Sequence, residues 1–448
     1  MVKNNNFQLV IFGVAGDLSR RKLLPALGKL ILEGKISSQI QIVGVERQKN
    51  SIDALLDSAK QFFDQEDAEL ACAKLAQVMS VFSMDLKNPA QYQKLKDHLD
   101  ASKKPNTERL FHFSTPADIF QDIILGLGKS GLNLPAESSN KLPRILIEKP
   151  FGEDLKSAQV LADIIKKYFQ EEQVYLIDHY LFKESVRNIL NLRFKNPIFQ
   201  SLWQTKLIES VKISIYEDFG ISNRIEFYEK TGALKDMVQN HLLELLAIAI
   251  MERPANWNQT AIHQAKLELL NSITPVAHDQ ATRGQYYGYR EEVGNPQSTT
   301  ETFVRLNLNS HDARWSQTKM TIEVGKALDD RRTEIELVTK TLNGDENKNI
   351  ITFHLQPLVA VDVGLWSKKP DSHELASFNL QTEPLKYPST DYESVFLDAA
   401  RGDQSFFVPI EEALALWRII DPLIEYWKQD DRDLLFYEQG VKAERVVR

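Results

Sequence analysis

The hydrophobic positions of the N-terminal part form short apolar runs that alternate with longer segments of helical spacing. The runs of strand length are residues 8–12, 40–45, 109–114, 144–147 and 174–177. Between them, apolar positions recur every three or four residues, for example over residues 23–31 and 155–169. Buried strands that alternate with helices are typical of a parallel sheet covered on both faces. The pattern predicts an α/β domain over residues 1–178.

The pattern of the chain changes beyond residue 181. Two segments, residues 181–202 and 236–251, have helical spacing, and the second is strongly apolar. Segments that alternate apolar and polar residues, without helices of similar length between them, are 211–215, 302–308, 320–324, 334–338 and 349–355. Successive strands of this kind predict an α+β domain with a large, mainly antiparallel sheet over residues 179–448. Helical spacing returns between residues 392 and 427.

Length, composition and charge indicate a two-domain globular protein and argue against nucleic-acid and membrane partners. A chain of 448 residues that is 43% hydrophobic and 26% charged has the length and composition of two globular domains. A net charge of -8 argues against a nucleic-acid partner, because such proteins need a basic face. The longest apolar run, residues 242–251, contains Glu244 and is too short to cross a bilayer. We therefore expect a cytoplasmic protein that binds neither nucleic acid nor membranes.

A glycine turn joins the first predicted strand to the first predicted helix. Gly13 and Gly16 would let the backbone approach a pyrophosphate, and the helix that follows offers unpaired N–H groups. Ser19 and Arg20 add hydrogen-bond donors nearby. An ordinary helix start is the alternative, since the spacing differs from the common three-glycine fingerprint.

The end of the second predicted strand bears on the choice of coenzyme. An acid at this place holds the ribose hydroxyls of NAD, whereas an arginine accommodates the additional phosphate of NADP. The sequence has Glu46 followed by Arg47. Arg47 favours NADP, and Glu46 would favour NAD if its side chain turned inward.

Three further strand ends carry polar residues. Thr115 follows residues 109–114, Lys149 follows residues 144–147, and Asp178 follows residues 174–177. Ligands bind at the carboxyl ends of parallel strands, so Thr115 is expected near the nicotinamide ribose and Lys149 near a ligand oxygen. A solvated strand end is the alternative for each.

Two segments hold candidate acid–base chemistry. Residues 177–184 bring together Asp178, His179, Tyr180 and Lys183, which is either an anion site beside an oriented base or a solvated helix start. His241 lies in an apolar helix, where a histidine is most often a satisfied core residue. If a carboxylate such as Asp178 held one ring nitrogen, the other nitrogen could accept a proton.

In their order along the chain, these segments resemble the glucose-6-phosphate dehydrogenase family over nearly the whole sequence. The matching motifs are residues 13–27, 148–152, 178–181 with 183–184, 236–243, 283–286, 300–303, 325–328 and 397–403. Departures from the family pattern include Leu176, where the family usually has arginine, Phe182, where it usually has glycine, and Glu323, where it usually has a cation.

The resemblance implies an NADP-dependent enzyme, with NAD possible, that oxidises glucose 6-phosphate to 6-phosphoglucono-1,5-lactone, the first step of the oxidative pentose phosphate pathway. It implies that His241 is the base and Asp178 its partner. The residues that it places at the sugar's phosphate are His179, Tyr180 and Lys183. Those that it places at the sugar ring are Lys149, Glu217, Asp236, Lys326, Arg331 and Gln356. Those that it places at the coenzyme are Gly13, Gly16, Asp17, Leu18, Ser19, Arg20, Arg47, Asp85, Thr115 and Lys149.

The resemblance also has implications for the fold and assembly. It implies a Rossmann-like coenzyme domain, a cis bond between Lys149 and Pro150, and a homodimer or homotetramer formed through the large sheet. Two alternatives stay open: a dehydrogenase of the same fold that prefers NAD or another sugar phosphate, and a non-catalytic relative that binds a sugar phosphate.

Overall fold

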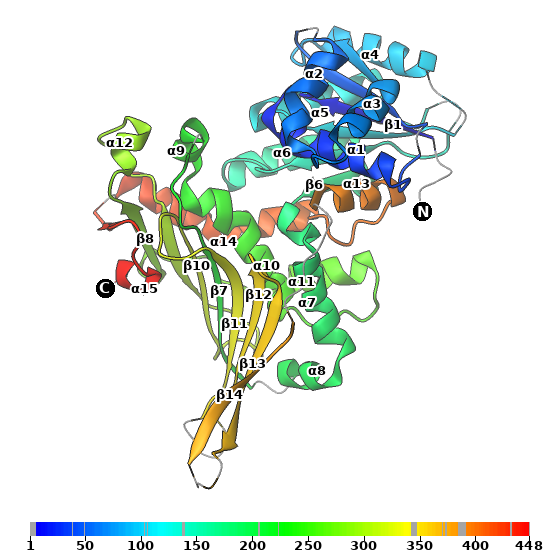
Figure 1. Cartoon of the computed structure of the whole chain (residues 1–448). Coiled ribbons are helices and arrows are strands. Elements are labelled where there is room, and N and C mark those ends of the chain that lie inside the picture. Colours follow the sequence, from blue (N-terminus) through cyan, green and yellow to red (C-terminus); the bar gives the residue numbers. More distant parts are fainter. Residues whose placement is uncertain are drawn as a thin grey trace. The chain divides into compact units, whose positions relative to one another are not determined.

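The computed structural model forms two compact units (Figure 1). The first consists of Met1–Phe182 with Ser389–Ile410, and the second of Lys183–Pro388 with Glu411–Arg448. The residues that the structure describes are 6–37, 39–48, 50–102, 104, 106–136, 139–204, 207–222, 224–341, 347–369, 371, 374–383, 391–430 and 432–447.

The first unit is built on a parallel sheet with the strand order β3-β2-β1-β4-β5-β6. Its strands are β1 (Phe7–Phe12), β2 (Gln41–Glu46), β3 (Met79–Ser83), β4 (Glu108–Phe113), β5 (Arg144–Glu148) and β6 (Val174–Ile177). The order reverses between β1 and β4, and dinucleotides bind at such a switch point. The predicted Rossmann-like domain is confirmed. Strand β3 was not predicted, because most of its residues are only half-buried and form no continuous apolar run.

Helices of the first unit pack in two groups. Helix α1 (Leu24–Leu32) contacts α2 (Ile52–Ala59), α3 (Ala68–Val78) and α13 (Asp391–Arg401). Helix α5 (Phe120–Ser130) contacts α4 (Pro89–Ser102) and α6 (Leu155–Tyr168). Right-handed connections that run in opposite directions from the switch point place two such groups on opposite faces of the sheet.

The first unit recruits a segment from far along the chain. The ring of Phe407 packs edge-on against Tyr175 and Phe182, with 4.7 Å between ring centroids in both pairs. Val408 pairs with Leu176 in an antiparallel bridge at the edge of the sheet. The sequence pattern placed the division between residues 178 and 179 and assigned everything beyond it to one domain. The first unit instead continues to Phe182 and includes Ser389–Ile410.

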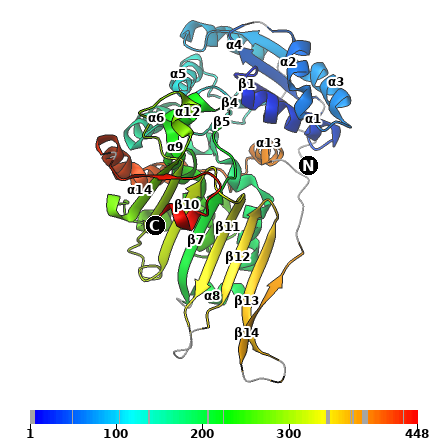
Figure 2. The same ribbon diagram turned by 60° about the vertical axis from the view of Figure 1, so that its left-hand side comes forward.

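The second unit contains a mixed sheet of nine strands among the described residues, in the order β14-β13-β12-β11-β7-β10-β9-β8-β15. Figure 2 shows its β14 edge. The strands are β7 (Ile208–Tyr216), β8 (Ala281–Tyr286), β9 (Phe303–Leu308), β10 (Lys319–Gly325), β11 (Arg332–Thr339), β12 (Ile350–Gln356), β13 (Ala360–Lys368), β14 (Leu375–Gln381) and β15 (Leu434–Tyr437). Only the β7–β10 and β8–β15 pairs among them are parallel, so the predicted mainly antiparallel sheet is confirmed.

A buried helix forms the centre of the second unit. Every residue of α10 (Leu243–Ile250) is buried, and this helix packs against α7 (Glu184–Lys195) and α11 (Gln259–Ser272). A π-helical segment, η6 (Leu234–Leu242), leads directly into α10 and contacts β7 and β10. The remaining helices are α8 (Pro197–Gln204), α9 (Ile225–Ala233), α12 (Tyr289–Val293), α14 (Ile410–Gln429) and α15 (Ala443–Val446). In the part of the chain that the structure describes, no helix combines the length and apolar character needed to cross a membrane.

Candidate active site

The glycine turn after β1 is closely packed against the end of β4. Gly13 has φ of +84°, and its N–H donates to the carbonyl of Val45 at 2.8 Å. A β-carbon at Gly13 would lie 2.4 Å from the carbonyl oxygen of Ser114, so no other residue fits this turn without rearrangement. The N–H of Gly16 donates back to the Gly13 carbonyl at 2.9 Å. The turn therefore presents bare backbone at the switch point of the sheet.

Unpaired polar atoms surround this turn. The hydroxyl oxygen of Thr115 and Nε of Arg20 are buried and have no hydrogen-bond partner among the described residues. The hydroxyl of Ser19 lies 3.1 Å from the Gly13 carbonyl oxygen and 2.9 Å from the Ser114 hydroxyl. Buried donors without acceptors are costly, and a phosphate or ribose oxygen would satisfy them. These residues fit a dinucleotide coenzyme.

Three other predicted coenzyme residues, Asp17, Leu18 and Asp85, are half-buried or exposed. Leu18 precedes the π-helical turn η1 (Ser19–Leu23) and is half-buried. Asp17 is exposed and lies 3.8 Å from Arg20 in a loose ion pair. Asp85 is exposed after β3, where its carboxylate accepts the N–H of Lys87 at 3.1 Å.

The two residues at the end of β2 differ in environment. The Glu46 side chain is buried, and its two carboxylate oxygens accept the backbone N–H of Asn50 at 2.9 Å and the side-chain amide of Asn50 at 2.8 Å. Arg47 is exposed. Glu46 thus closes the loop after its own strand, and Arg47 is the residue available to a ligand in solvent.

The strand ends β5 and β6 carry the next candidates. The Lys149–Pro150 bond is cis, as expected, and Lys149 is half-buried. The preceding Glu148 is buried, and its carboxylate lies 3.3 Å from the ring of His112. Burial raises the pKa of the Tyr392 phenol well above its usual value, and the charge of Glu148 and its hydrogen bond raise it further. This cluster anchors the backbone immediately before Lys149.

Beyond β6, the carboxylate of Asp178 caps a short 3₁₀ turn, His179–Phe182, by accepting the N–H of Tyr180 at 2.9 Å. Asp178 and Tyr180 are buried, and the rings of His179 and Tyr180 lie 5.1 Å apart. Phe182 is fully buried against Phe407 and does not adopt a positive φ. The phenylalanine at the place of the family's usual glycine is therefore accommodated without a left-handed backbone.

In the second unit, the strand register places four predicted substrate residues at one end of the sheet. Glu217 follows β7 and Lys326 follows the parallel strand β10. Arg331 precedes the antiparallel strand β11, and Gln356 ends β12, opposite Thr333. The sequence predicted these residues only through the family resemblance, because their proximity depends on pairing between distant strands.

Lys326 is the centre of this group. Its ammonium forms an ion pair with Glu217 and lies 5.2 Å from the ring centre of Tyr228 and 5.6 Å from that of Phe219. The guanidinium of Arg331 lies 5.6 Å from the same Phe219 ring, although Arg331 is exposed. Such cation–π contacts hold both cations at this sheet end.

Asp236 and Tyr228 complete the cluster from the helical side. Asp236 is buried on η6, 3.7 Å from the guanidinium of Arg224. Burial raises the pKa of the Tyr228 phenol well above its usual value, and the charges of Glu301, Asp236 and Glu217 raise it further. Tyr228, Phe219 and Arg224 were not predicted, since each stands outside the recognised motifs.

His241 is fully buried on the same π-helical segment, and its backbone N–H donates to the side chain of Asn240 at 2.6 Å. Short π-helical segments are rare and occur frequently at functional sites. Lys183 directly precedes α7 as its N-terminal capping residue. Asp178 belongs to the first unit and His241 to the second, so their pairing stays a prediction.

A Rossmann-like unit with a glycine turn at its switch point, joined in one chain to a unit that holds a buried histidine and a lysine–carboxylate cluster at one end of its sheet, fits a nicotinamide-coenzyme dehydrogenase. Two family descriptions match the chain. "Glucose-6-phosphate dehydrogenase, NAD binding domain" matches residues 10–188, and "Glucose-6-phosphate dehydrogenase, C-terminal domain" matches residues 190–446. The chain belongs to the glucose-6-phosphate dehydrogenase family.

Individual relatives agree with this assignment. The glucose-6-phosphate 1-dehydrogenase of Chlamydia muridarum is 34% identical over 94% of this chain and 90% of its own length. That of Buchnera aphidicola is 34% identical over 98% of this chain and 94% of its own length. A solved glucose-6-phosphate dehydrogenase in complex with glucose 6-phosphate superposes with a TM-score of 0.89 at 29% identity, over 98% of this chain and 96% of the other. The Mycobacterium avium enzyme has a TM-score of 0.85 at 30% identity, over 97% of this chain and 94% of its own.

Proposed function

We propose that this protein oxidises glucose 6-phosphate at its anomeric carbon to 6-phosphoglucono-1,5-lactone with NADP as hydride acceptor, in the first step of the oxidative pentose phosphate pathway. The observation that carries the proposal is the likeness, over nearly the whole chain, to the dehydrogenase solved with glucose 6-phosphate. We assign coenzyme binding to residues of the first unit and most contacts with the sugar ring to the second.

His241 is the base in this proposal. It takes the proton of the anomeric hydroxyl, and Asp178 stabilises the imidazolium that forms. Burial of His241 supports the role, because it excludes water from the proton transfer and leaves the imidazole with few orientations. The nicotinamide supplies the hydride chemistry, and the chain supplies orientation and the base.

Two groups of side chains bind the rest of the sugar phosphate. His179, Tyr180 and Lys183 contact the phosphate, for which clustered cations and hydroxyl donors are suited. The hydroxyls of the ring are bound by Lys149, Glu217, Asp236, Lys326, Arg331 and Gln356. In support, the second unit already holds Lys326 between Glu217 and Tyr228, so little side-chain freedom is lost when the sugar binds.

NADP is the coenzyme that we propose, through Arg47. Both oxygens of the neighbouring Glu46 accept hydrogen bonds from Asn50, which removes the acid that would hold the ribose hydroxyls of NAD. Arg47 is exposed at the strand end and able to pair with the additional phosphate. The glycine turn, with Asp17, Leu18, Ser19 and Arg20, binds the pyrophosphate, and Thr115, Lys149 and Asp85 complete the site.

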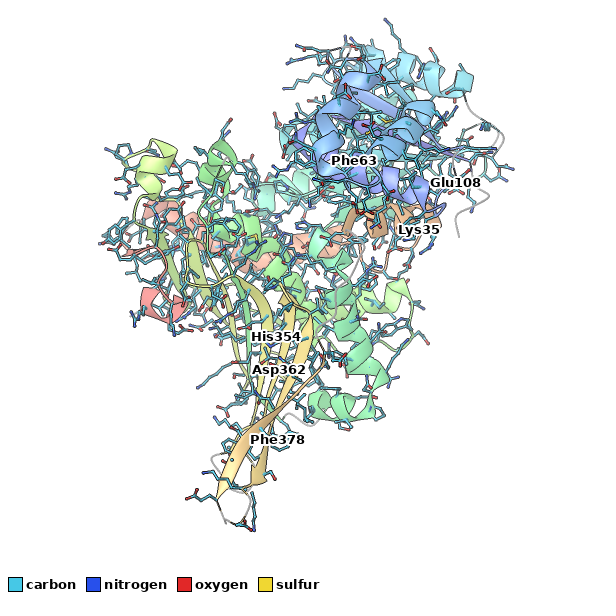
Figure 3. All side chains as sticks on the ribbon, viewed as in Figure 1. Lys35, Phe63, Glu108, His354, Asp362 and Phe378 are labelled. Carbon is cyan, nitrogen blue, oxygen red and sulfur yellow. The ribbon has the colours of Figure 1, made fainter. Side chains whose placement is uncertain are left out.

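We further propose that the protein is a cytoplasmic homodimer or homotetramer without nucleic-acid or membrane partners. A relative from Arabidopsis thaliana, 32% identical over 97% of this chain, is named a cytoplasmic glucose-6-phosphate 1-dehydrogenase. The outer strand β14 exposes Phe378 (Figure 3) at 43% and Leu380 at 57%. Two apolar residues on an edge strand are a surface that a second sheet would cover.

The proposal is tested by mixing the purified protein with glucose 6-phosphate and either NADP or NAD, and following the absorbance of the reduced nicotinamide. We expect turnover with a higher kcat/KM for NADP. Preference for NAD would refute the role of Arg47. Absence of turnover with both coenzymes, on folded protein, would favour the non-catalytic relative, and turnover only with a different sugar phosphate would refute the substrate.

A further inference from the structure

A small pocket in the second unit is lined by none of the residues assigned above to coenzyme or substrate. It lies among the end of α7, helix α8, the segment after α10 and the loop before β10, and its volume is about 130 Å3. The polar and aromatic side chains that line it include Arg193, Trp203, Glu252, Arg253, Arg314 and Trp315.

Arg193 is buried in the wall of this pocket with only 2% of its surface exposed. Two of its nitrogens, Nη1 and Nη2, donate to the carbonyls of Ile248 and Met251, both at 2.6 Å. Its guanidinium also lies 4.5 Å from the ring centre of Phe194 and 5.0 Å from that of Trp203. Nε is buried with no hydrogen-bond partner among the described residues, and no carboxylate there forms an ion pair with Arg193.

Trp315 provides a second buried donor. Its side chain lines the same pocket and is 4% exposed, and its Nε1 has no partner in the part of the chain that the structure describes. An indole nitrogen only donates, so an apolar group cannot satisfy it. Two buried N–H groups at one pocket therefore require an acceptor.

The charges around the pocket favour a negative acceptor. The lining contains three arginines and one glutamate, and that glutamate, Glu252, is paired with Arg314 at 2.8 Å. Arg314 also pairs with Asp312 at 2.5 Å, which lies outside the lining. Arg193 and the exposed Arg253 leave an excess of positive charge. Burial, followed by the nearby charge of Arg314, lowers the pKa of Arg193 to about 9, as expected of a cation that lacks a counterion.

We propose that this pocket binds a small oxyanion, which accepts hydrogen bonds from Nε of Arg193 and Nε1 of Trp315. Phosphate, sulfate and a short carboxylate share the required chemistry, because each places two acceptor oxygens on one negative group. A volume of about 130 Å3 is well above what one water molecule requires, so such an anion fits the pocket.

The anion would reinforce a junction between two helices that matter for the site. Arg193 lies in the last turn of α7, which begins directly after Lys183. The carbonyls that it holds lie at the C-terminal end of the helical run that carries His241. Because the anion binds the guanidinium that joins these ends, we expect the bound protein to unfold at a higher temperature.

The test is isothermal titration calorimetry of the full-length protein with inorganic phosphate and, separately, with acetate, at constant ionic strength. We expect saturable binding of at least one of them, and the tighter of the two identifies the class of anion. Trp315→Phe keeps an aromatic ring and removes only the donor, so we expect about tenfold weaker binding. Trp366→Phe, at an exposed tryptophan of β13, is the matched control and should bind as the wild type does.

A further variant separates this pocket from the proposed substrate site, which also accepts phosphate. Lys183→Gln should leave the calorimetric binding at the pocket unchanged, whatever it does to turnover. The proposal is overturned if neither anion binds, if Trp315→Phe binds as tightly as the wild type, or if Lys183→Gln abolishes all binding.

Discussion

At the scale of single residues, the buried carboxylate of Glu323 is compensated by its neighbours. Glu323 is fully buried in place of the family's usual cation. Its carboxylate accepts hydrogen bonds from the hydroxyl of Tyr216 and from Nε of Arg305, and it lies 3.6 Å from the ammonium of Lys212. Burial and the charge of Glu323 together raise the pKa of the Tyr216 phenol, so this hydroxyl remains a donor at all physiological pH values. These contacts explain how a buried acid is stable at a position where the family usually has a cationic side chain.

The role of His241 leads to a prediction about catalysis. His241→Asn removes the proton acceptor, so we expect kcat to fall by about 10²- to 10⁴-fold with little change in the affinity for glucose 6-phosphate. Steady-state kinetics and calorimetry measure the two effects. The matched control is His311→Asn, at an exposed histidine, which should retain wild-type kcat. Retention of kcat in His241→Asn would exclude it as the base.

The role of Arg47 leads to a prediction about coenzyme choice. Arg47→Ala removes the partner of the additional phosphate, so KM for NADP should rise by about tenfold or more, whereas KM for NAD should stay close to that of the wild type. Steady-state kinetics with each coenzyme measures this difference. Equal changes in the two KM values would contradict the assignment.

Individual site residues were predictable from the sequence to different degrees. Gly13 stood out because a turn between a buried strand and a helix constrains its backbone, and the structure shows the reason in its close contact with Ser114. Tyr228 and Phe219 carried no such signal. Their contacts with Lys326 depend on the folded arrangement of β7, α9 and β10, which local spacing does not encode.

At the scale of elements, the helical segment that carries Asp236 and His241 depends on a buried acid at its start. Gly232 turns the chain into this segment with φ of +58°, in a space where any side chain would overlap the carboxylate of Glu301. That carboxylate accepts the N–H of Leu234 at 2.9 Å, which satisfies one of the free donors at the helix start. Burial nevertheless raises the pKa of Glu301 from 4.5 to about 6.

This shift predicts a pH dependence of stability. Because the pKa of Glu301 is higher in the folded state, its contribution to stability is present below about pH 4.5 and is lost as the pH rises through about 6. The loss amounts to about 2 kcal/mol at neutral pH. Glu301→Gln keeps the acceptor for Leu234 and does not titrate. Its free energy of unfolding minus that of the wild type should therefore be larger at pH 7 than at about pH 4, by about 2 kcal/mol. Chemical denaturation at both pH values measures the difference, and an unchanged difference would contradict the account.

The hydrophobic pattern predicted five of the six strands that the structure describes in the first sheet and five of the nine in the second. The alternating strands were found because successive residues of a strand face opposite sides of the sheet. Strands β3, β8, β13, β14 and β15 were not predicted, and neither were all of the pairings between strands. The parallel pairing of β10 with β7 was not predicted. Strands with one exposed face look alike in either direction, so polarity alone cannot give their orientation.

At the scale of the whole molecule, the first unit is completed by Ser389–Ile410. In this unit, the ammonium of Lys29 on α1 lies 3.2 Å from Glu393 on α13, and the side chain of Arg144 on β5 donates to the carbonyl of Ala399 at 2.8 Å. A division of the sequence into two continuous segments cannot reveal that a distant segment joins the first unit, since the contacts link residues that are far apart along the chain.

The proposed assembly is also tested at this scale. Replacing both Phe378 and Leu380 by lysine places charge on the exposed face of β14, so the molar mass in solution should fall to that of the monomer. Sedimentation analysis measures it. Leu70→Lys, at a leucine of the first unit with 54% exposure, is the matched control and should keep the wild-type mass. An unchanged mass for the double variant, or a monomeric wild type, would contradict assembly through this strand.

Transfer of hydride from the anomeric carbon of glucose 6-phosphate to NADP is the central claim. The most direct measurement uses glucose 6-phosphate that carries deuterium on this carbon, together with NADP and the purified protein, followed by mass spectrometry of the coenzyme. The account predicts reduced NADP that carries the deuterium and a sugar product that has lost it. Reduced coenzyme without deuterium, or labelled substrate that remains unchanged, would contradict the account.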